Sequence, residues 1–243
     1  MLSILCSLAM AGWQHDAATG AAAMAAASPD LAGEVAAWEP STTRSGHKRF
    51  VGPYSHDPRL TPLFLHRLAE GQDSEAVRTA LVEAVSRQKG EGYSEALPDL
   101  ALHDAQATVR AVAVESLRGV DRDVSGTLTE ALADPVSGVR EAAARTLGRV
   151  GDASAVPALI PILADSSPEV RAAAARSLGT LRDPQAFEAL VGLLDDEHAD
   201  VRLETLHALE RVAPADAPYL SQLDELSVDD DARVARAATA LMR

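Results

Sequence analysis

Apolar and polar positions along most of this chain follow one pattern that recurs every 30 to 33 residues. The two closest copies are VREAAARTLG at 139–148 and VRAAAARSLG at 170–179. Looser copies begin at Val77, Val109, Val201 and Val234. Self-similarity at such a period is typical of a stack of similar structural units.

Each copy predicts two helices joined by a short turn, which we name helix A and helix B. In the first copy, apolar residues at helical spacing predict helix A over 58–69 and helix B over 74–88. Dividing the rest of the chain in the same way gives repeats at 57–89, 94–120, 124–150, 153–182, 184–213 and 216–243. We therefore expect an all-α solenoid of about six two-helix repeats.

Apolar columns at fixed distances from the repeat valine predict the core of this stack. Eight residues after the valine stand Val85, Leu117, Leu147, Leu178, Leu209 and Met242. Seven residues before it, where helix A should end, stand Leu102, Leu132, Leu163 and Leu194. The alanines of helix B keep that helix narrow, so neighbouring repeats can approach closely.

Glycine and proline mark further positions in the pattern. Gly148 and Gly179 follow the last core leucine of their repeats, which predicts a helix end or a tight link at each. Pro161 falls inside helix A of the fourth repeat and predicts a kink there.

Two charged columns accompany the apolar ones. An aspartate stands five residues before the valine, at Asp104, Asp134, Asp165, Asp196 and Asp229. An arginine follows the valine directly, at Arg78, Arg110, Arg140, Arg171 and Arg202. Donors and acceptors at constant offsets predict a ladder in which each guanidinium meets the aspartate of an adjacent repeat. The terminal repeats depart from this rule, because Asp73 is displaced by one position and Ala235 replaces the arginine.

The combined pattern, Leu-x-Asp, four residues, then Val-Arg-x-x-Ala-x-x-x-Leu-Gly, is seen in full at 132–148. It resembles the HEAT-repeat family, and most closely its short bacterial, armadillo-like form found in phycobiliprotein lyases. The resemblance covers residues 57–243 and implies a helical solenoid that binds proteins. It implies little about any reaction.

Residues 1–56 do not share the repeat pattern. An apolar run at 2–13 and an alanine-rich stretch at 17–27 favour a signal for export to the periplasm or cell envelope over a cytoplasmic leader, although no basic residue precedes them. Residues 38–56 combine aromatic side chains with Arg44, Lys48 and Arg49. We expect an irregular arm that covers the first repeat, with a recognition arm as the alternative.

Composition limits the classes of function. The formal net charge of −14 disfavours nucleic acid, because an acidic surface repels phosphates. The single cysteine, Cys6, excludes an intrachain disulfide or a multi-cysteine zinc site. No apolar run approaches the ~20 residues of a membrane-spanning helix.

Catalytic and metal-binding motifs are missing from the sequence. The seven histidines form neither a His-Glu-x-x-His motif nor another compact ligand spacing. The His-Glu pairs that a resemblance to deoxyhypusine hydroxylase would require do not occur. We therefore expect no enzyme activity and no catalytic, cofactor or metal site.

One group of residues is a candidate partner surface. Resemblance to HEAT-like solenoids places helix B on a concave face, where the outward positions include Arg145, Arg149, Arg176, His207 and Arg211. These residues predict a docking groove for an acidic peptide or protein segment. The alternative is local pairing on a solvated face, between Glu141 and Arg145 and between Glu204 and His207.

The sequence thus predicts a monomeric, non-catalytic scaffold that presents the concave face of a HEAT-like solenoid to a protein or acidic peptide. An accessory lyase- or chaperone-like protein that acts on a cofactor-bearing partner is the alternative. A broad groove would favour the scaffold, whereas a deep pocket with convergent polar groups would favour the accessory enzyme.

Overall fold

The structure is a computed structural model that describes residues 57–213 and 220–242. The predicted leader and arm at 1–56 lie outside the described residues. The chain divides into two compact units, residues 1–122 and 123–243, and each is described by itself.

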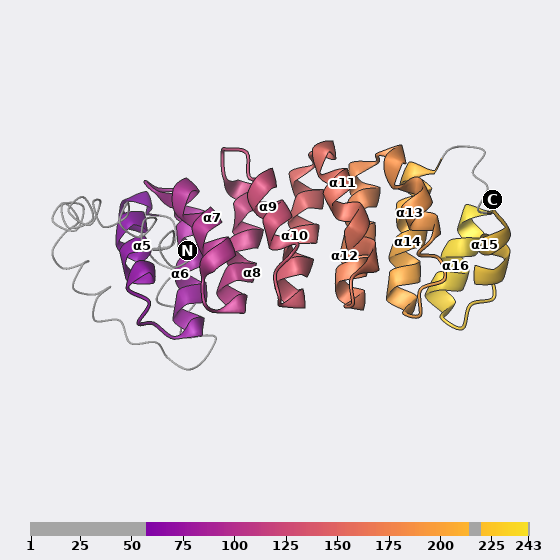
Figure 1. The fold of residues 1–243 in the computed structure, drawn as a ribbon, viewed down its shortest axis with the longest axis horizontal. Helices are drawn as coiled ribbons and strands as arrows, with labels where there is room; N and C mark the ends of the chain where they lie inside the picture. The colour runs from indigo at the N-terminus through magenta and orange to yellow at the C-terminus, as the bar shows by residue number, and fades with distance from the viewer. Residues whose placement is uncertain (1–56, 214–219, 243) are drawn as a thin grey trace, which may run out of the picture. The chain divides into compact units, whose positions relative to one another are not determined.

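Unit 1 contains two helix pairs in its described part. A 3₁₀ turn, η1 (Pro58–Leu60), leads into α5 (Thr61–Glu70) and α6 (Glu75–Gln88), which form the first pair. The second pair is α7 (Tyr93–His103) and α8 (Ala107–Ser116), followed by η2 (Leu117–Gly119). The two B helices, α6 and α8, pack side by side, and each also contacts its own A helix (Figure 1).

Unit 2 contains four helix pairs with long B helices and short A helices. The B helices are α10 (Ser137–Val150), α12 (Pro168–Leu181), α14 (Ala199–Val212) and α16 (Ala232–Leu241). The A layer is α9 (Ser125–Ala131), η3 (Ala153–Ala155), α11 (Val156–Leu159), η4 (Ile160–Ala164), η5 (Pro184–Ala186), α13 (Phe187–Val191) and α15 (Leu220–Leu226). Successive B helices are neighbours along the unit (Figure 1). The predicted all-α stack of two-helix repeats is confirmed.

The predicted apolar columns form much of the core of both units, although Leu102 of unit 1 is only half-buried. The repeat valines are fully buried in all six repeats, and so are the residues eight positions later in the first five. The sixth member of that column was predicted wrongly, because Met242 is 44 % exposed. It lies just beyond α16, where no further described helix covers it.

Helix A of the fourth repeat breaks where Pro161 was expected to kink it. The α-helix α11 ends at Leu159, and the chain continues as the 3₁₀ segment η4. Proline removes a backbone donor and crowds the preceding turn, which accounts for the change in helix type. This prediction is confirmed.

The prediction of a helix end or a tight link at Gly148 and Gly179 was wrong. Both lie inside B helices, which continue to Val150 and Leu181 and are capped by Gly151 and Arg182, each with positive φ. Gly148 faces Ser177 of the next repeat, and Gly179 faces Ala208. A Cβ at Gly179 would lie 2.6 Å from the Ala208 Cα, closer than two carbon atoms can approach. These glycines therefore allow neighbouring B helices to pack closely.

We predict that Gly179→Ala lowers the free energy of unfolding by about 1–3 kcal/mol, because α12 and α14 must separate to admit the methyl group. Gly138→Ala is the matched control, since Gly138 lies in α10 with open space around its Cα. It should raise stability by about 0.5–1 kcal/mol. Urea denaturation measures both, and equal effects of the two changes would contradict the close crossing.

Candidate functional site

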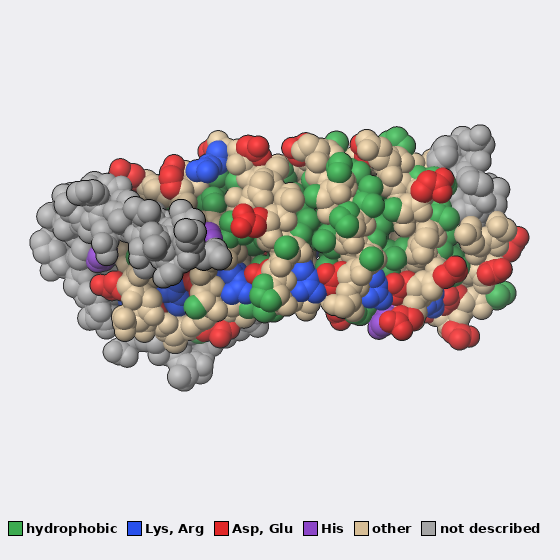
Figure 2. Space-filling model, viewed as in Figure 1, with side chains coloured by type: hydrophobic (Ala, Val, Ile, Leu, Met, Phe, Trp, Pro, Cys, Tyr) green, Lys and Arg blue, Asp and Glu red, His purple; other side chains and the backbone are tan. Residues whose placement is uncertain are grey.

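Unit 2 contains a series of arginine–aspartate pairs that connect successive repeats, and we call this series the ladder. Arg171 donates from Nε and Nη2 to the two carboxylate oxygens of Asp196, at 2.7 and 2.9 Å. Arg140 meets Asp165 in the same bidentate manner, at 2.7 and 2.8 Å. Arg202 meets Asp229 at 2.8 Å in both bonds. Figure 2 shows basic and acidic side chains alternating along one edge of this unit.

Each ladder residue also binds backbone. The Nη1 of Arg171 donates to the carbonyl of Asp165, in its own repeat, at 2.9 Å. The Asp196 carboxylate accepts the amide of His198, the residue that precedes α14, at 2.9 Å. One rung thus fixes the turn between helices A and B in two repeats at once.

Unit 1 repeats this arrangement. Arg78 donates to the carboxylate of Asp104 and, at 2.7 Å, to the carbonyl of Leu68. Arg110 donates to the carbonyl of Asp104 at 2.8 Å. The displaced Asp73 pairs with Arg67 instead. In unit 2, Asp134 accepts the amide of Val136 through its carboxylate and the guanidinium of Arg140 through its carbonyl.

Pairing lowers the pKa of the ladder carboxyls. The hydrogen bonds from Arg140 lower the pKa of Asp165, against the effect of burial. Those from Arg202 lower the pKa of Asp229 in the same way. Burial raises the pKa of Asp196, but the hydrogen bonds from Arg171 and from the His198 amide outweigh it and leave the pKa lowered.

The five residues of the candidate partner surface occupy two columns on the B helices of unit 2. Six residues after the repeat valine stand Arg145, Arg176 and His207, on α10, α12 and α14. Ten residues after it stand Arg149, Thr180 and Arg211, on the same helices. Residues four apart on a helix share a face, so the two columns lie side by side. We call these six positions the basic face.

Two arginines of the basic face are bound by acidic side chains. Arg145 donates to Glu141 on its own helix at 3.2 Å, as the local-pairing interpretation expects. Glu204 does not pair with His207, as that interpretation proposed, but accepts two hydrogen bonds from Arg176 of the preceding repeat, at 2.9 and 2.6 Å. Local spacing along one helix does not indicate this pair, because the two residues are 28 positions apart.

Arg149 and Arg211, the other two arginines of the basic face, are not paired in this way. Both side chains are exposed, and neither forms a hydrogen bond or ion pair with any described residue. A hollow of about 330 Å³ lies at this face beside the contact of α12 with α14, lined by Arg176, Thr180, Glu204, His207, Ala208 and Arg211. The basic face therefore has both compensated and uncompensated cations.

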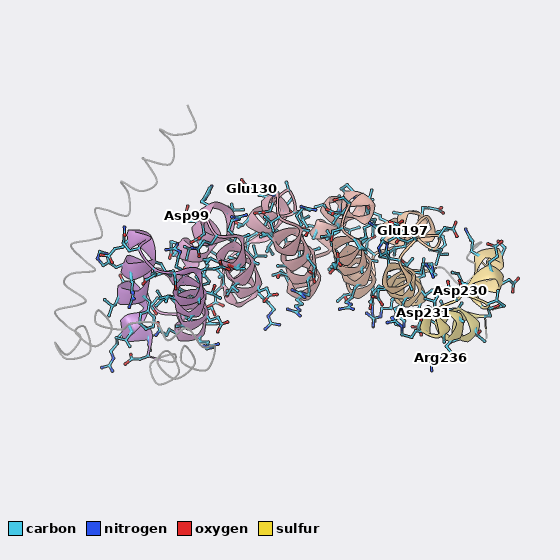
Figure 3. All side chains as sticks on the ribbon, turned by 90° about the horizontal axis from the view of Figure 1, so that it is seen from below. Asp99, Glu130, Glu197, Asp230, Asp231 and Arg236 are labelled. Carbon is cyan, nitrogen blue, oxygen red and sulfur yellow. The ribbon has the colours of Figure 1, made fainter. Side chains whose placement is uncertain are left out.

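Acidic side chains project from other parts of the surface. Figure 3 shows Glu130 projecting from α9, and Glu197, Asp230 and Asp231 projecting from the last two repeats. In the described ranges, no group of three or more His, Cys, Asp or Glu side chains is arranged to hold a metal ion. None of the described helices combines the length and apolar character needed to cross a membrane.

We predict that Arg171→Ala lowers the free energy of unfolding by about 3 kcal/mol. The change leaves the Asp196 side chain, only 6 % exposed, without its guanidinium partner. Arg59→Ala is the matched control, because Arg59 also pairs with an aspartate but its side chain is 79 % exposed. Thermal denaturation should show a clear loss in the first variant and no shift in the second. Equal melting temperatures would show that the ladder does not stabilise the fold.

Stability should also fall at acidic pH. A carboxyl with a lowered pKa in the folded protein binds its proton less readily than in the unfolded chain, so unfolding takes up protons. The contribution is complete above the ordinary aspartate pKa of about 3.9 and is lost as pH falls below it. Urea titrations between roughly pH 6 and pH 3, a range that brackets this value, should show this decline. In Asp165→Asn, the free energy of unfolding should depend less steeply on pH.

The comparisons with known proteins agree with the fold. A family model described as HEAT repeats matches residues 101–167 and 156–242, more than half of the chain. No curated protein matches. One similar solved structure is the complex of CpcE and CpcF of phycocyanin lyase from Nostoc sp. PCC7120, with 22 % identity, a TM-score of 0.54 and coverage of 74 % of each chain.

Two engineered proteins are similar as well. One has 22 % identity and a TM-score of 0.53, covering 73 % of this chain and 93 % of its own. The other has 20 % identity and a TM-score of 0.55, covering 86 % of this chain and 66 % of its own. At these identities the structural likeness shows the fold alone, whereas the matched repeats show the family. The chain belongs to the HEAT-repeat family.

Proposed function

We propose that this protein is a non-catalytic scaffold that docks a protein partner, or an acidic peptide segment of one, on the basic face. The observation that carries the proposal is the charge distribution. The chain has a net charge of −14, yet four arginines and a histidine share one face of three consecutive B helices, and the two arginines there that no acidic side chain binds, Arg149 and Arg211, leave this face locally positive. Such a local reversal of charge attracts an acidic segment and orients it.

The shape of the unit supports the same proposal. Stacked helices hold the basic face on a rigid framework, because each rung of the ladder and each close glycine crossing fixes one repeat against the next. A partner therefore meets side chains whose spacing is set before it binds. Preorganisation of this kind lowers the entropic cost of association.

A second candidate is an accessory lyase- or chaperone-like protein that acts on a cofactor-bearing partner. The hollow beside α14 supports it, since it brings together Arg176, Thr180, Glu204 and His207. Its volume, about 330 Å³, lies near the lower end of the range for small-molecule sites. The complex of CpcE and CpcF shares the fold and supports the idea that a second protein takes part.

Affinity capture tests the scaffold directly. The test variant is Arg149→Glu/Arg211→Glu, because these exposed arginines have no described partner whose loss could unfold the protein. The control is Arg118→Glu/Arg236→Glu, which changes the net charge equally at exposed positions outside the basic face. We expect a partner, identified by mass spectrometry, that wild type and control retain and that the test variant binds at least about tenfold more weakly.

Equal capture by all three proteins would place the docking site elsewhere. Absence of any specific partner would instead favour the second candidate. Binding of a small-molecule cofactor, followed by its absorbance, would then be the decisive measurement.

A further inference from the structure

We infer that the basic face is a two-point anchor, which binds an extended segment through two acidic residues about six positions apart. This inference rests on the proposed scaffold function and specifies the partner's chemistry. The two anchor points are Arg149 on α10 and Arg211 on α14, the two exposed arginines of the face that are not bound by acidic side chains.

On α12, between the two anchors, the two columns of the basic face contain no uncompensated charge. The position on α12 that corresponds to Arg149 and Arg211 is Thr180, and its hydroxyl donates to the Arg176 carbonyl at 2.9 Å. The charge of Arg176 itself is balanced by Glu204. A negative group placed over α12 therefore gains little, whereas negative groups over α10 and α14 each meet an uncompensated guanidinium.

Helix packing sets the distance between the anchors. Neighbouring helices lie about 8–10 Å apart, so α10 and α14, which are separated by α12, lie about 16–20 Å apart. An extended chain advances about 3.3 Å per residue, and residues six apart point to the same side. Two carboxylates at i and i+6 therefore span the anchors, whereas carboxylates at i and i+3 reach only one.

The alternative is that Arg149 and Arg211 only stabilise the helices in which they lie. Both stand in the last turn of a B helix, where a cation complements the helix dipole. In that case, removal of either arginine lowers the melting temperature and has no effect on the spacing that a ligand requires. The experiment must therefore measure dependence on spacing as well as affinity.

Rigid peptides with two aspartates at a fixed separation can test the distance between the anchors. Polyproline advances about 3.1 Å per residue with three residues per turn, so aspartates at positions 1 and 7 share a face about 19 Å apart. An isomer with aspartates at 1 and 4 has the same composition, charge and shared face, but a separation of about 9 Å. Both peptides should have blocked termini, so that terminal charges do not bind.

Fluorescence anisotropy with the full chain should show about two- to fivefold tighter binding of the 1,7 isomer, because it forms one exposed ion pair more than the 1,4 isomer. Arg149→Ala and Arg211→Ala should each abolish this preference, whereas Arg118→Ala should preserve it. Equal affinity for the two isomers, no measurable binding of the 1,7 isomer, or a preference that survives Arg149→Ala would overturn the anchor. If the partner capture described above succeeds while the isomers bind equally, the scaffold function stands and only the two-point spacing fails.

Discussion

The bidentate bond between an arginine and the aspartate of the following repeat is the interaction on which this fold depends. Helices A and B of one repeat present only a narrow apolar stripe, built largely from alanine, valine and leucine. Such a stripe allows neighbouring helices to slide, because small aliphatic side chains specify position weakly. The guanidinium of Arg171, with its planar arrangement of donors, fixes direction as well as distance. The apolar core supplies most of the association, and the ladder supplies the register.

Close helix crossings complement the ladder. At Gly179 the B helices approach so closely that a single methyl group would not fit, and Ser177 reaches the carbonyl of Ala144 across the Gly148 crossing. The ladder lies in the turn before each B helix, whereas the crossings lie in its second half. Two separated constraints leave little freedom for one repeat to rotate against the next, as the proposed two-point anchor requires.

Much of this structure could be predicted from the sequence, because the repeat places equivalent residues at equal offsets. The helix pairs, the buried valines and the break at Pro161 all follow from local pattern. The role of Gly148 and Gly179 could not be inferred from their own helices, since it depends on which residue of the next repeat faces them. The repeat pattern does contain a signal for this contact. The glycine stands nine residues after the valine of its own repeat, and the small residue that it meets stands seven residues after the valine of the next repeat. The partner of Glu204 could not be predicted from the sequence either, because it depends on the distance between two helices.

Each central repeat contains both an acceptor for the repeat before it and a donor for the repeat after it. Arg140 binds Asp165, and Arg171, in the same repeat as Asp165, binds Asp196. The same arginine–aspartate pair therefore connects these successive repeats, and one repeat could replace another in the stack. Excision of the 31 residues 153–183 would place Arg140 and Asp196 25 positions apart, as Arg140 and Asp165 are now, so the stack could lose or gain a whole repeat without a new kind of interface. The sixth repeat has the acceptor Asp229 but Ala235 in the donor column, so it accepts the bond from the fifth repeat and has no guanidinium at the position that binds the following repeat elsewhere.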